Sequence, residues 1–335
     1  MSKIRAEHVF TSESVSEGHP DKVCDQISDA ILDACLAQDP ESRVACETLT
    51  TTNLVVISGE ITTRAKVNWQ DVALNAIRKI GYNDPAVGFC ADDAKVMICI
   101  HRQSPDISQG VTEGMGRFTE QGAGDQGMMF GYASNETPDM MPATIYYAHK
   151  IVEELARLRK SDPVKYRYLR PDSKSQVSIR YVGGRPKAVE TIVVSHQHTP
   201  DMPAEWLEAL VRDVVKRVIP AELLGGEIRY YVNPTGRFEV GGPHGDTGLT
   251  GRKIIVDTYG TGVLADDGDL EKVIREVFSL KPAEIVRQLG LKHPGQGWCY
   301  QDTAAYGHFG RAQFPWEKID RVAELKAAAE KFPRK

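Results

Sequence analysis

The chain has 335 residues, and its 41 Lys and Arg against 46 Asp and Glu give a net charge of −5. Hydrophobic residues make up 41% and charged residues 26%, which are ordinary globular values and exclude a disordered or collagen-like chain. The acidic balance argues against a bulk nucleic-acid binder, and no apolar run approaches the roughly 20 residues of a membrane span. The six cysteines form no C-x-x-C pair, and residues 1–10 have no apolar signal stretch, so we expect a cytoplasmic protein of two or three structural units.

The apolar periodicity predicts alternating helices and strands along the chain. Residues 20–38 have Pro20 at the first helical position and one apolar stripe, which is typical of an amphipathic helix. Residues 43–63 alternate and then become rich in β-branched side chains, which predicts two strands. Similar patterns predict helices at 69–80 (ending at Gly81), 142–160 and 204–218, a hairpin of 175–182 with 187–196, a strand at 227–232, and helices near 270–278, 283–289 and 318–331.

Two glycine-rich tracts interrupt this pattern. Residues 101–127 contain six glycines and no apolar period, which predicts a long mobile loop. Residues 233–261 form the second tract.

A weak internal repeat suggests how the elements are grouped. A strand, a polar turn and a helix recur at Trp69–Ile80, Trp206–Val218 and Leu270–Phe278, although helix periodicity alone would produce part of the agreement. We therefore predict an α+β fold of three pseudo-repeated βαβ-like units with helices packed on sheets.

The start of the first helix is a candidate phosphate site. His19, Asp21 and Lys22 lie where free backbone N–H groups and the positive end of the helix dipole favour anions, and a carboxylate there can hold Mg²⁺. The alternative is that Asp21 only complements the helix dipole. Asp25, Asp29 and Asp33 follow on one helix face, and we expect Lys or Arg partners from other elements.

Further candidates lie in strands and loops. Glu47 and Glu60 interrupt apolar strand patterns, so each faces solvent or meets a cation. In residues 122–127, glycines let the backbone approach a ligand, with Asp125 as an acceptor, or they form a tight structural turn.

The tract 233–253 is the richest stretch of such residues. Arg237, Arg252 and Lys253 offer cations for phosphate, Phe238 offers a face for a base, and Asp246 offers an acceptor. We favour a nucleotide site over a solvated loop. From these residues alone, a Mg²⁺-dependent kinase is the rival function.

At these positions the chain resembles the S-adenosylmethionine synthetase (methionine adenosyltransferase) family. The matching strings run in the family's order over nearly the whole chain: residues 10–22 (FTSESVSEGHPDK), 45–48 (ACET), 59–63 (GEITT), 103–107 (QSPDI), 122–127 (GAGDQG), 170–176 (RPDSKSQ), 233–260 and 304–311 (AAYGHFGR). The resemblance implies three pseudo-repeated α/β units. It also implies transfer of the adenosyl group of ATP to the sulfur of L-methionine, followed by hydrolysis of bound tripolyphosphate to phosphate and pyrophosphate.

The resemblance assigns a role to each candidate residue. It implies Mg²⁺, two per site, with Asp21 as a ligand, and K⁺ at Glu47. The ATP-binding residues would be His19, Asp125, Asp172, Lys174, Arg237, Phe238, Asp246, Arg252 and Lys253, of which His19, Lys174, Arg252 and Lys253 would be catalytic. Methionine would be bound by Glu60, Gln103 and Asp246.

The family's architecture is expected to carry over with one change. The expected units are 6–104, 122–241 and 242–335, with a mobile gating loop in 105–121, and the family's shared active sites imply a homodimer or a dimer of dimers. After Gly260, however, a family segment with two lysines, a second Mg²⁺-binding Asp, a helix and strands is missing, so the third unit is shortened. This gap makes a catalytically impaired or regulatory homologue the alternative to an active synthetase.

Overall fold

The computed structural model describes residues 7–104, 109–112, 114–115, 117, 119–128, 131–260 and 268–330. Its strands are β1 (Glu7–Val15), β2 (Arg43–Thr51), β3 (Leu54–Thr62), β4 (Lys95–His101), β5 (Leu169–Val182), β6 (Arg185–His198), β7 (Arg229–Val232) and β8 (Gly248–Leu249). Its helices are α1 (Pro20–Leu36), α2 (Trp69–Ile80), α4 (Ala143–Ser161), α5 (Ala204–Val218), α6 (Gly242–Gly245), α7 (Ile254–Asp257), α8 (Gly268–Val277), α9 (Pro282–Gln288), α10 (Tyr300–Thr303) and α11 (Val322–Glu330).

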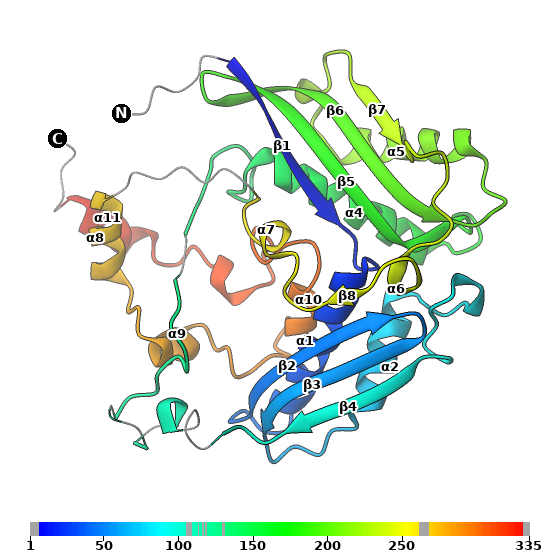
Figure 1. Ribbon diagram of the computed structural model, residues 1–335. Helices are drawn as coiled ribbons and strands as arrows, with labels where there is room; N and C mark the ends of the chain where they lie inside the picture. The colour runs from blue at the N-terminus through cyan, green and yellow to red at the C-terminus, as the bar shows by residue number, and fades with distance from the viewer. Residues whose placement is uncertain are drawn as a thin grey trace.

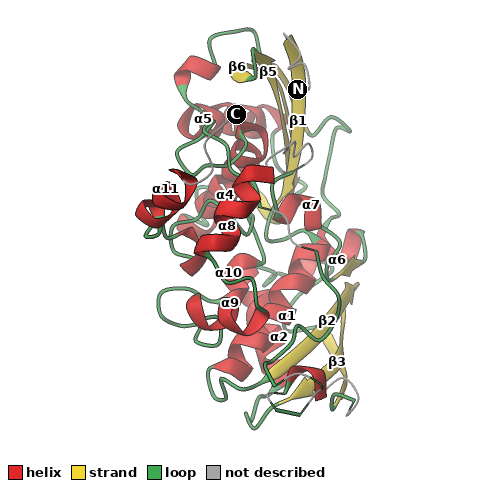
Figure 2. Cartoon of the chain, turned by 90° about the vertical axis from the view of Figure 1, so that its left-hand side faces the viewer, coloured by secondary structure: helices red, strands yellow, loops and turns green. Residues whose placement is uncertain are grey.

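The strands form two four-stranded sheets, each covered by helices on one face (Figures 1 and 2). In the first sheet the order is β1-β5-β6-β7, with antiparallel pairs except for the parallel pair of β6 and β7. Helices α4 and α5 pack on it around fully buried side chains such as Ile151, Ile192 and Val214. Long amphipathic helices and β-branched strands thus bury their apolar sides together.

The second sheet has the order β4-β3-β2-β8 and is backed by α1 and α2. Val23 and Ile27 of α1 and Ile77 of α2 are fully buried against it. Its last strand, β8, comes from the second glycine-rich tract and pairs with the end of β2, Thr50 opposite Gly248. This pairing brings residues far apart in the sequence to the start of α1.

The predicted elements agree with most of the observed ones. Helices α2 and α5 have the predicted bounds, and α2 ends at Gly81, whose φ of 110° favours glycine. The hairpin of β5 and β6 is longer than predicted, because the strands continue to Leu169 and His198. Residues 318–321 are not helical, and α11 begins only at Val322.

Strands β1 and β4 were not predicted. In β1 the apolar residues Val9 and Phe10 are adjacent rather than alternating, so the strand has no clear period. Each of the two lies at the edge of its sheet, and Val9 and Met97 are about half exposed, so burial imposes little pattern on the sequence.

The α+β class is confirmed, and the last unit is short. The described residues from 242 to 330 form helices and the two-residue strand β8, which joins the second sheet rather than a sheet of its own. The predicted junction of the missing segment at 261–267 lies outside the described residues, as do 105–108, 113, 116 and 118 of the predicted gating loop. Among the helices that are described, none is long and apolar enough to cross a membrane.

Candidate functional site

The start of α1 is built by close backbone packing. Pro20 occupies the first helical position, and His19 caps the helix by accepting the Asp21 N–H at its Nδ1, 3.2 Å away. Gly18 has no room for a side chain, because a Cβ would lie 2.3 Å from the carbonyl carbon of Pro171. Tyr82 donates its hydroxyl to the Gly18 carbonyl at 2.5 Å. The phosphate-suited end of α1 is therefore held against the start of β5 and the core of the second sheet.

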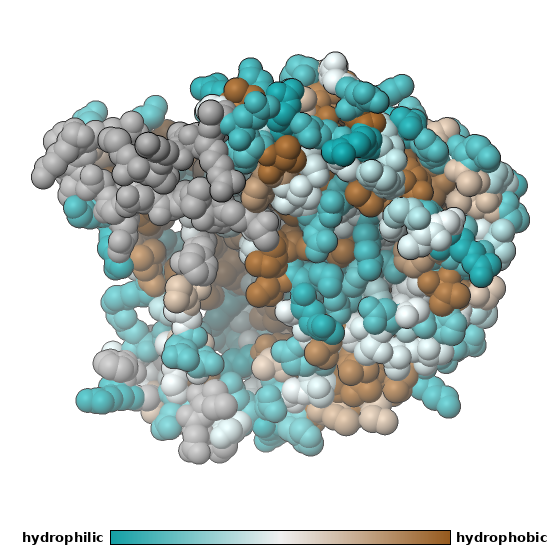
Figure 3. Space-filling view, turned by 45° about the horizontal axis from the view of Figure 1, so that its top comes forward, coloured by the Kyte–Doolittle hydropathy of each residue, from teal (hydrophilic) through white to brown (hydrophobic). Residues whose placement is uncertain are grey.

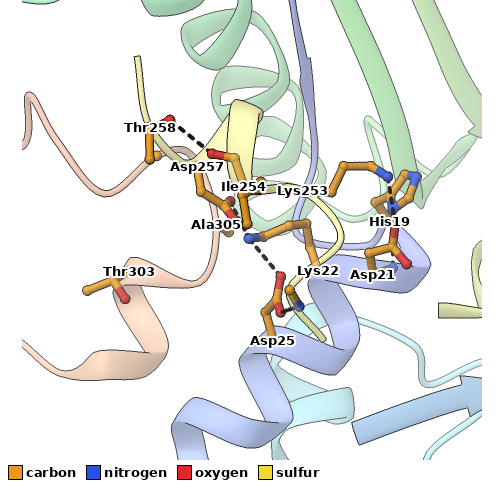
Figure 4. A network of polar contacts seen from close by, with 12 residues as sticks. His19, Asp21, Lys22, Asp25, Lys253, Ile254, Asp257, Thr258, Thr303 and Ala305 are labelled. Atoms are coloured by element: carbon orange, nitrogen blue, oxygen red, sulfur yellow. Dashed lines mark hydrogen bonds and ion pairs between the residues drawn. The ribbon is translucent and has the colours of Figure 1, made fainter. Parts of the chain in front are cut away.

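Asp21 lies between this helix and the glycine-rich tract. Its Oδ2 contacts Lys253 Nζ at 2.6 Å, and its Oδ1 accepts the Leu249 N–H at 3.0 Å (Figure 4). The approach requires glycine at 248, since a Cβ there would lie 2.2 Å from the Pro20 carbonyl oxygen. Although burial pushes the pKa of Asp21 upward, the bond from Lys253 and the N–H of Leu249 hold it below its ordinary value. Asp21 is therefore ionised.

His19 is buried next to cations and is neutral. Burial, followed by the charges of Lys253 and Lys174, lowers the pKa of His19 to about 3. Because its Nδ1 accepts a hydrogen bond, the hydrogen-bond pattern assigns the ring proton to Nε2. The imidazole can therefore donate to an anionic oxygen without carrying a charge.

Asp172 is a buried carboxylate on β5 beside the same tract. Its Oδ2 accepts the Gly242 N–H at 2.8 Å, whereas its buried Oδ1 has no hydrogen-bond partner among the described residues. Burial raises the pKa of Asp172 to about 6, against the opposing effects of the Gly242 N–H and the Lys174 charge. Lys174, two residues further along β5, is exposed and lies opposite Val15 of β1.

These contacts bring together five of the predicted residues: His19, Asp21, Asp172, Lys174 and Lys253. They come from α1, β5 and the glycine-rich tract, and we call them the phosphate-side cluster. A helix N-terminus with two lysines and a neutral imidazole donor is suited to bind a polyphosphate.

A buried ion pair next to this cluster connects α1 to α7. Lys22, 1% exposed, contacts Asp257 of α7 at 2.5 Å and Asp25 at 2.9 Å (Figure 4). Asp25 also accepts the Gly251 N–H at 3.0 Å. These bonds fasten α7 and the end of the tract to α1.

The expectation of cationic partners from other elements was wrong for Asp25 and Asp33. Asp25 pairs with Lys22 of its own helix, and Asp33 instead accepts the N–H groups of Tyr300 and Gln301, both at 2.8 Å, at the start of α10. Asp29 has its pKa raised to about 8 by burial and by the charges of Asp25 and Asp33. Free helix-end N–H groups thus take the place of a cation at Asp33.

The base-side residues of the tract lie beside the end of β6. Phe238 is half-buried, and its N–H donates to His198 Nε2 at 3.0 Å. Arg237 is 82% exposed and only 4.0 Å from Glu239, a weak surface contact. Asp246 and Arg252 are exposed. Asp125 is exposed and accepts the Gln126 N–H, and among the described residues it has no hydrogen bond or ion pair with the phosphate-side cluster.

The predicted methionine-side residues lie elsewhere. Glu60 is exposed on β3, opposite Ala45 of β2. Gln103 lines a pocket of about 280 Å³ together with Arg43, Val44, Ala45, Val111, Gln121, Gly122, Ala123, Pro282 and Val286, and its buried Oε1 has no partner among the described residues. This pocket and Glu60 lie near Ala45, five residues along β2 from the contact of Thr50 with β8, or about 17 Å. They are therefore separated, along β2, from the strand β8 that contacts Asp21.

Glu47 is exposed on β2 and accepts a hydrogen bond from Thr250. Val286, on α9, was missed as a pocket residue, because an apolar residue on an amphipathic helix carries no signal that separates a pocket from a core.

Sequence comparisons identify relatives over most of the chain. Models of the N-terminal, central and C-terminal domains of S-adenosylmethionine synthetase match residues 7–105, 120–238, and 240–268 with 261–318. The S-adenosylmethionine synthase of Desulfosudis oleivorans is 46% identical over 388 residues, which cover 96% of this chain and 98% of that protein.

The same comparisons indicate that a segment of the family is absent from this chain. The C-terminal domain matches in two pieces that overlap at residues 261–268, as expected where two similar strings have been joined. Because 96% of these 335 residues is about 322, some 66 of the 388 aligned residues have no counterpart in this chain.

Proposed function

This chain belongs to the S-adenosylmethionine synthetase family, whose members make S-adenosylmethionine from ATP and methionine, and we propose that the phosphate-side cluster is the site of this reaction. The observation that carries the assignment is the convergence of His19, Asp21, Asp172, Lys174 and Lys253 from three separate segments. The matches give the alternative of an impaired or regulatory homologue no support over this activity, and they replace the kinase hypothesis.

The proposed chemistry requires positioning and charge stabilisation rather than a base. Methionine sulfur is a neutral nucleophile, so it forms a bond to C5′ of ATP while the C5′–O bond breaks and its electron pair leaves with the tripolyphosphate. Lys174, Arg252 and Lys253 stabilise that leaving charge, and His19 donates its Nε2 proton to a phosphate oxygen as a hydrogen bond. The bound tripolyphosphate is then hydrolysed to phosphate and pyrophosphate at the same cations.

The remaining ATP contacts follow the tract. Phe238 offers its ring to adenine, and Arg237 lies beside it. The Oδ1 of Asp172, which has no hydrogen-bond partner in the described part of the chain, is an acceptor available to the nucleotide. Asp246 adds a second acceptor between the substrates, and Asp125 reaches ATP from the loop of residues 122–127.

On the methionine side, the pocket of Gln103 has the size and lining for a small amino acid. Its Oε1 has no partner among the described residues and can accept a hydrogen bond, and Val111 and Val286 supply apolar contacts for a thioether side chain. Glu60 carries the charge needed for the methionine ammonium group.

Enzymes of this family depend on metal ions, and we propose Mg²⁺ at Asp21 and K⁺ at Glu47. Among the described residues no group of three or more His, Cys, Asp or Glu side chains could hold a metal. The single carboxylate of Asp21 fits Mg²⁺ that is held by one protein carboxylate together with the phosphates of the substrate, and we propose two such ions per ATP. When bound, such ions neutralise charge on the leaving tripolyphosphate. With the family's second aspartate and two lysines missing, Lys174, Arg252 and Lys253 take a larger share of that task.

A second copy of the chain completes the site in this proposal. Ala45, beside the methionine pocket, lies about 17 Å along β2 from Thr50, which pairs with β8, and we propose that ATP bound at the phosphate-side cluster of one subunit meets methionine bound by its partner. Apolar side chains of the sheets are exposed, among them Val9, Met97 and Leu249, and Figure 3 shows apolar patches on one face of the molecule. Such patches mark subunit interfaces. We propose a homodimer or a dimer of dimers.

The direct test is S-adenosylmethionine formation by the purified chain of verified mass, with ATP, methionine, Mg²⁺ and K⁺. Product together with phosphate and pyrophosphate is expected. Release of ADP instead, or a folded chain that gives no product, would contradict the proposal.

Glu60→Gln is expected to raise the KM for methionine about 10- to 100-fold with little effect on the KM for ATP. The amide keeps the size of the side chain but removes the charge that meets the ammonium group. Glu13→Gln, on β1, is the matched control and should leave both constants unchanged. A larger effect on ATP than on methionine would show that Glu60 was misassigned.

The pH dependence of kcat/KM for ATP is expected to show the titration of Asp172. Its pKa is raised to about 6, and we propose that the ionised carboxylate accepts from the nucleotide. Activity should therefore fall as the pH drops through about 6, since this ratio reports the free enzyme. Asp172→Asn, low at every pH, should lack this limb. An unchanged limb in the variant would assign it to another group.

A further inference from the structure

His198 at the end of β6 makes an unusual double contact with Phe238. The His198 N–H donates to the Phe238 carbonyl at 3.0 Å, and the Phe238 N–H donates to His198 Nε2, also at 3.0 Å. On the other side of the ring, Nδ1 lies 2.8 Å from the Thr199 carbonyl and must therefore carry the proton. The side chain is 5% exposed, so the imidazole cannot reorient without leaving a buried group unpaired.

The next residue of the tract is held just as firmly. The Glu239 carbonyl accepts from Arg170 Nη1 at 2.9 Å and from Gln197 Nε2 at 3.1 Å. A Cβ on Gly241 would lie 2.7 Å from Cε2 of Phe238, so the backbone closes over the aromatic ring. The ring is thus fixed by hydrogen bonds on its own backbone and by close packing on its edge.

None of these hydrogen bonds joins residues of the apolar core of the first sheet, which lies on the helix-covered face of that sheet. They act on one short segment, Phe238–Gly241, in a tract whose glycines would otherwise leave it conformationally free. A rigid aromatic face reduces the entropy lost when a base binds.

We propose that His198 is a positioning residue that holds Phe238 in place for the adenine base. The proposal rests on the proposed function, since it requires that Phe238 contacts the nucleotide. A group that acts only on base binding affects ground state and transition state alike, so it changes the KM for ATP and not kcat.

His198→Ala should raise the KM for ATP about tenfold, the effect of about one hydrogen-bonded contact, with kcat changed less than twofold. His198→Gln should recover most of this loss, because its amide oxygen can accept the Phe238 N–H. His196→Gln is the matched control. His196 is also buried on β6, and its Nδ1 likewise contacts the carbonyl of the next residue, Gln197, but the Phe238 N–H donates to His198 and not to His196. It should leave the KM for ATP unchanged even where it lowers the melting temperature.

A double-variant series separates this inference from the proposed function. If Phe238→Leu raises the KM for ATP and His198→Ala adds nothing in that background, His198 acts through Phe238. If Phe238→Leu alone has no effect, the adenine role of Phe238 is wrong. If Phe238→Leu has its effect but His198→Ala does not, or if kcat falls as much as KM rises, only the positioning role is overturned.

Discussion

Replacing Asp21 with asparagine is expected to lower kcat for S-adenosylmethionine formation about 10²- to 10³-fold. The Asp21 carboxylate accepts a hydrogen bond from Lys253 Nζ at 2.6 Å. In our proposal it would also hold the Mg²⁺ that neutralises charge on the leaving tripolyphosphate. The amide can still accept the Leu249 N–H through its oxygen, so the contact with β8 and the fold should survive. Initial rates at saturating ATP and methionine, with circular dichroism, measure both effects.

The control for this substitution is Asp71→Asn. Asp71 also lies in the first turn of a helix, α2, and its side chain accepts a hydrogen bond from Asn68 at 2.6 Å, its one side-chain partner among the described residues. The rate of the Asp71→Asn variant should therefore be unchanged. A Mg²⁺ titration supplies a second readout, in which the Asp21 variant should need a much higher concentration. Equal rates for the two variants would remove Asp21 from the site.

The fold was predicted best where one face of an element is buried against its neighbours. Helix α5 buries Leu207, Val211 and Val214 on one stripe, and that period is visible in the sequence. The edge strands β1 and β4 have no such requirement. Their positions depend on pairing with strands distant in sequence or across a crossover, which local pattern does not encode.

The site was predictable in its residue types and less so in its geometry. Glycine at 248 and the charges of Asp21 and Lys253 are visible in the sequence, but only the structure shows that β8 brings them together. The contact of His198 with Phe238 could not be predicted, because a histidine ending an apolar strand is consistent with a core residue. The separation of Gln103 from the phosphate-side cluster likewise follows from strand register rather than from residue type.

The second large effect is on stability. Lys22→Met is expected to lower the free energy of unfolding by about 3–5 kcal/mol, because it leaves the carboxylates of Asp25 and Asp257 buried without their cation. Burial alone would lower the pKa of Lys22, but the charges of the two carboxylates outweigh it and raise the pKa. The ammonium group is therefore charged at pH 7. Urea unfolding at pH 7 measures the loss. Lys79→Met removes an exposed ion pair in which Lys79 Nζ lies 3.7 Å from Asp302 Oδ1, and it should lower the free energy of unfolding by no more than about 0.5 kcal/mol.

The same variant should show a characteristic pH dependence. The pKa of Asp257 is already raised by burial, and without Lys22 the folded variant binds a proton there more tightly than the unfolded chain does. Lowering the pH from 7 towards 5 therefore favours the folded form, and the deficit relative to the unsubstituted chain should shrink. A deficit that stays constant over this range would mean that lost packing of the lysine stem, rather than the unpaired carboxylates, accounts for the destabilisation. In that case α7 would be held in place by backbone contacts with the segment after α10, such as the bond from the His308 N–H to the Asp257 carbonyl at 2.8 Å.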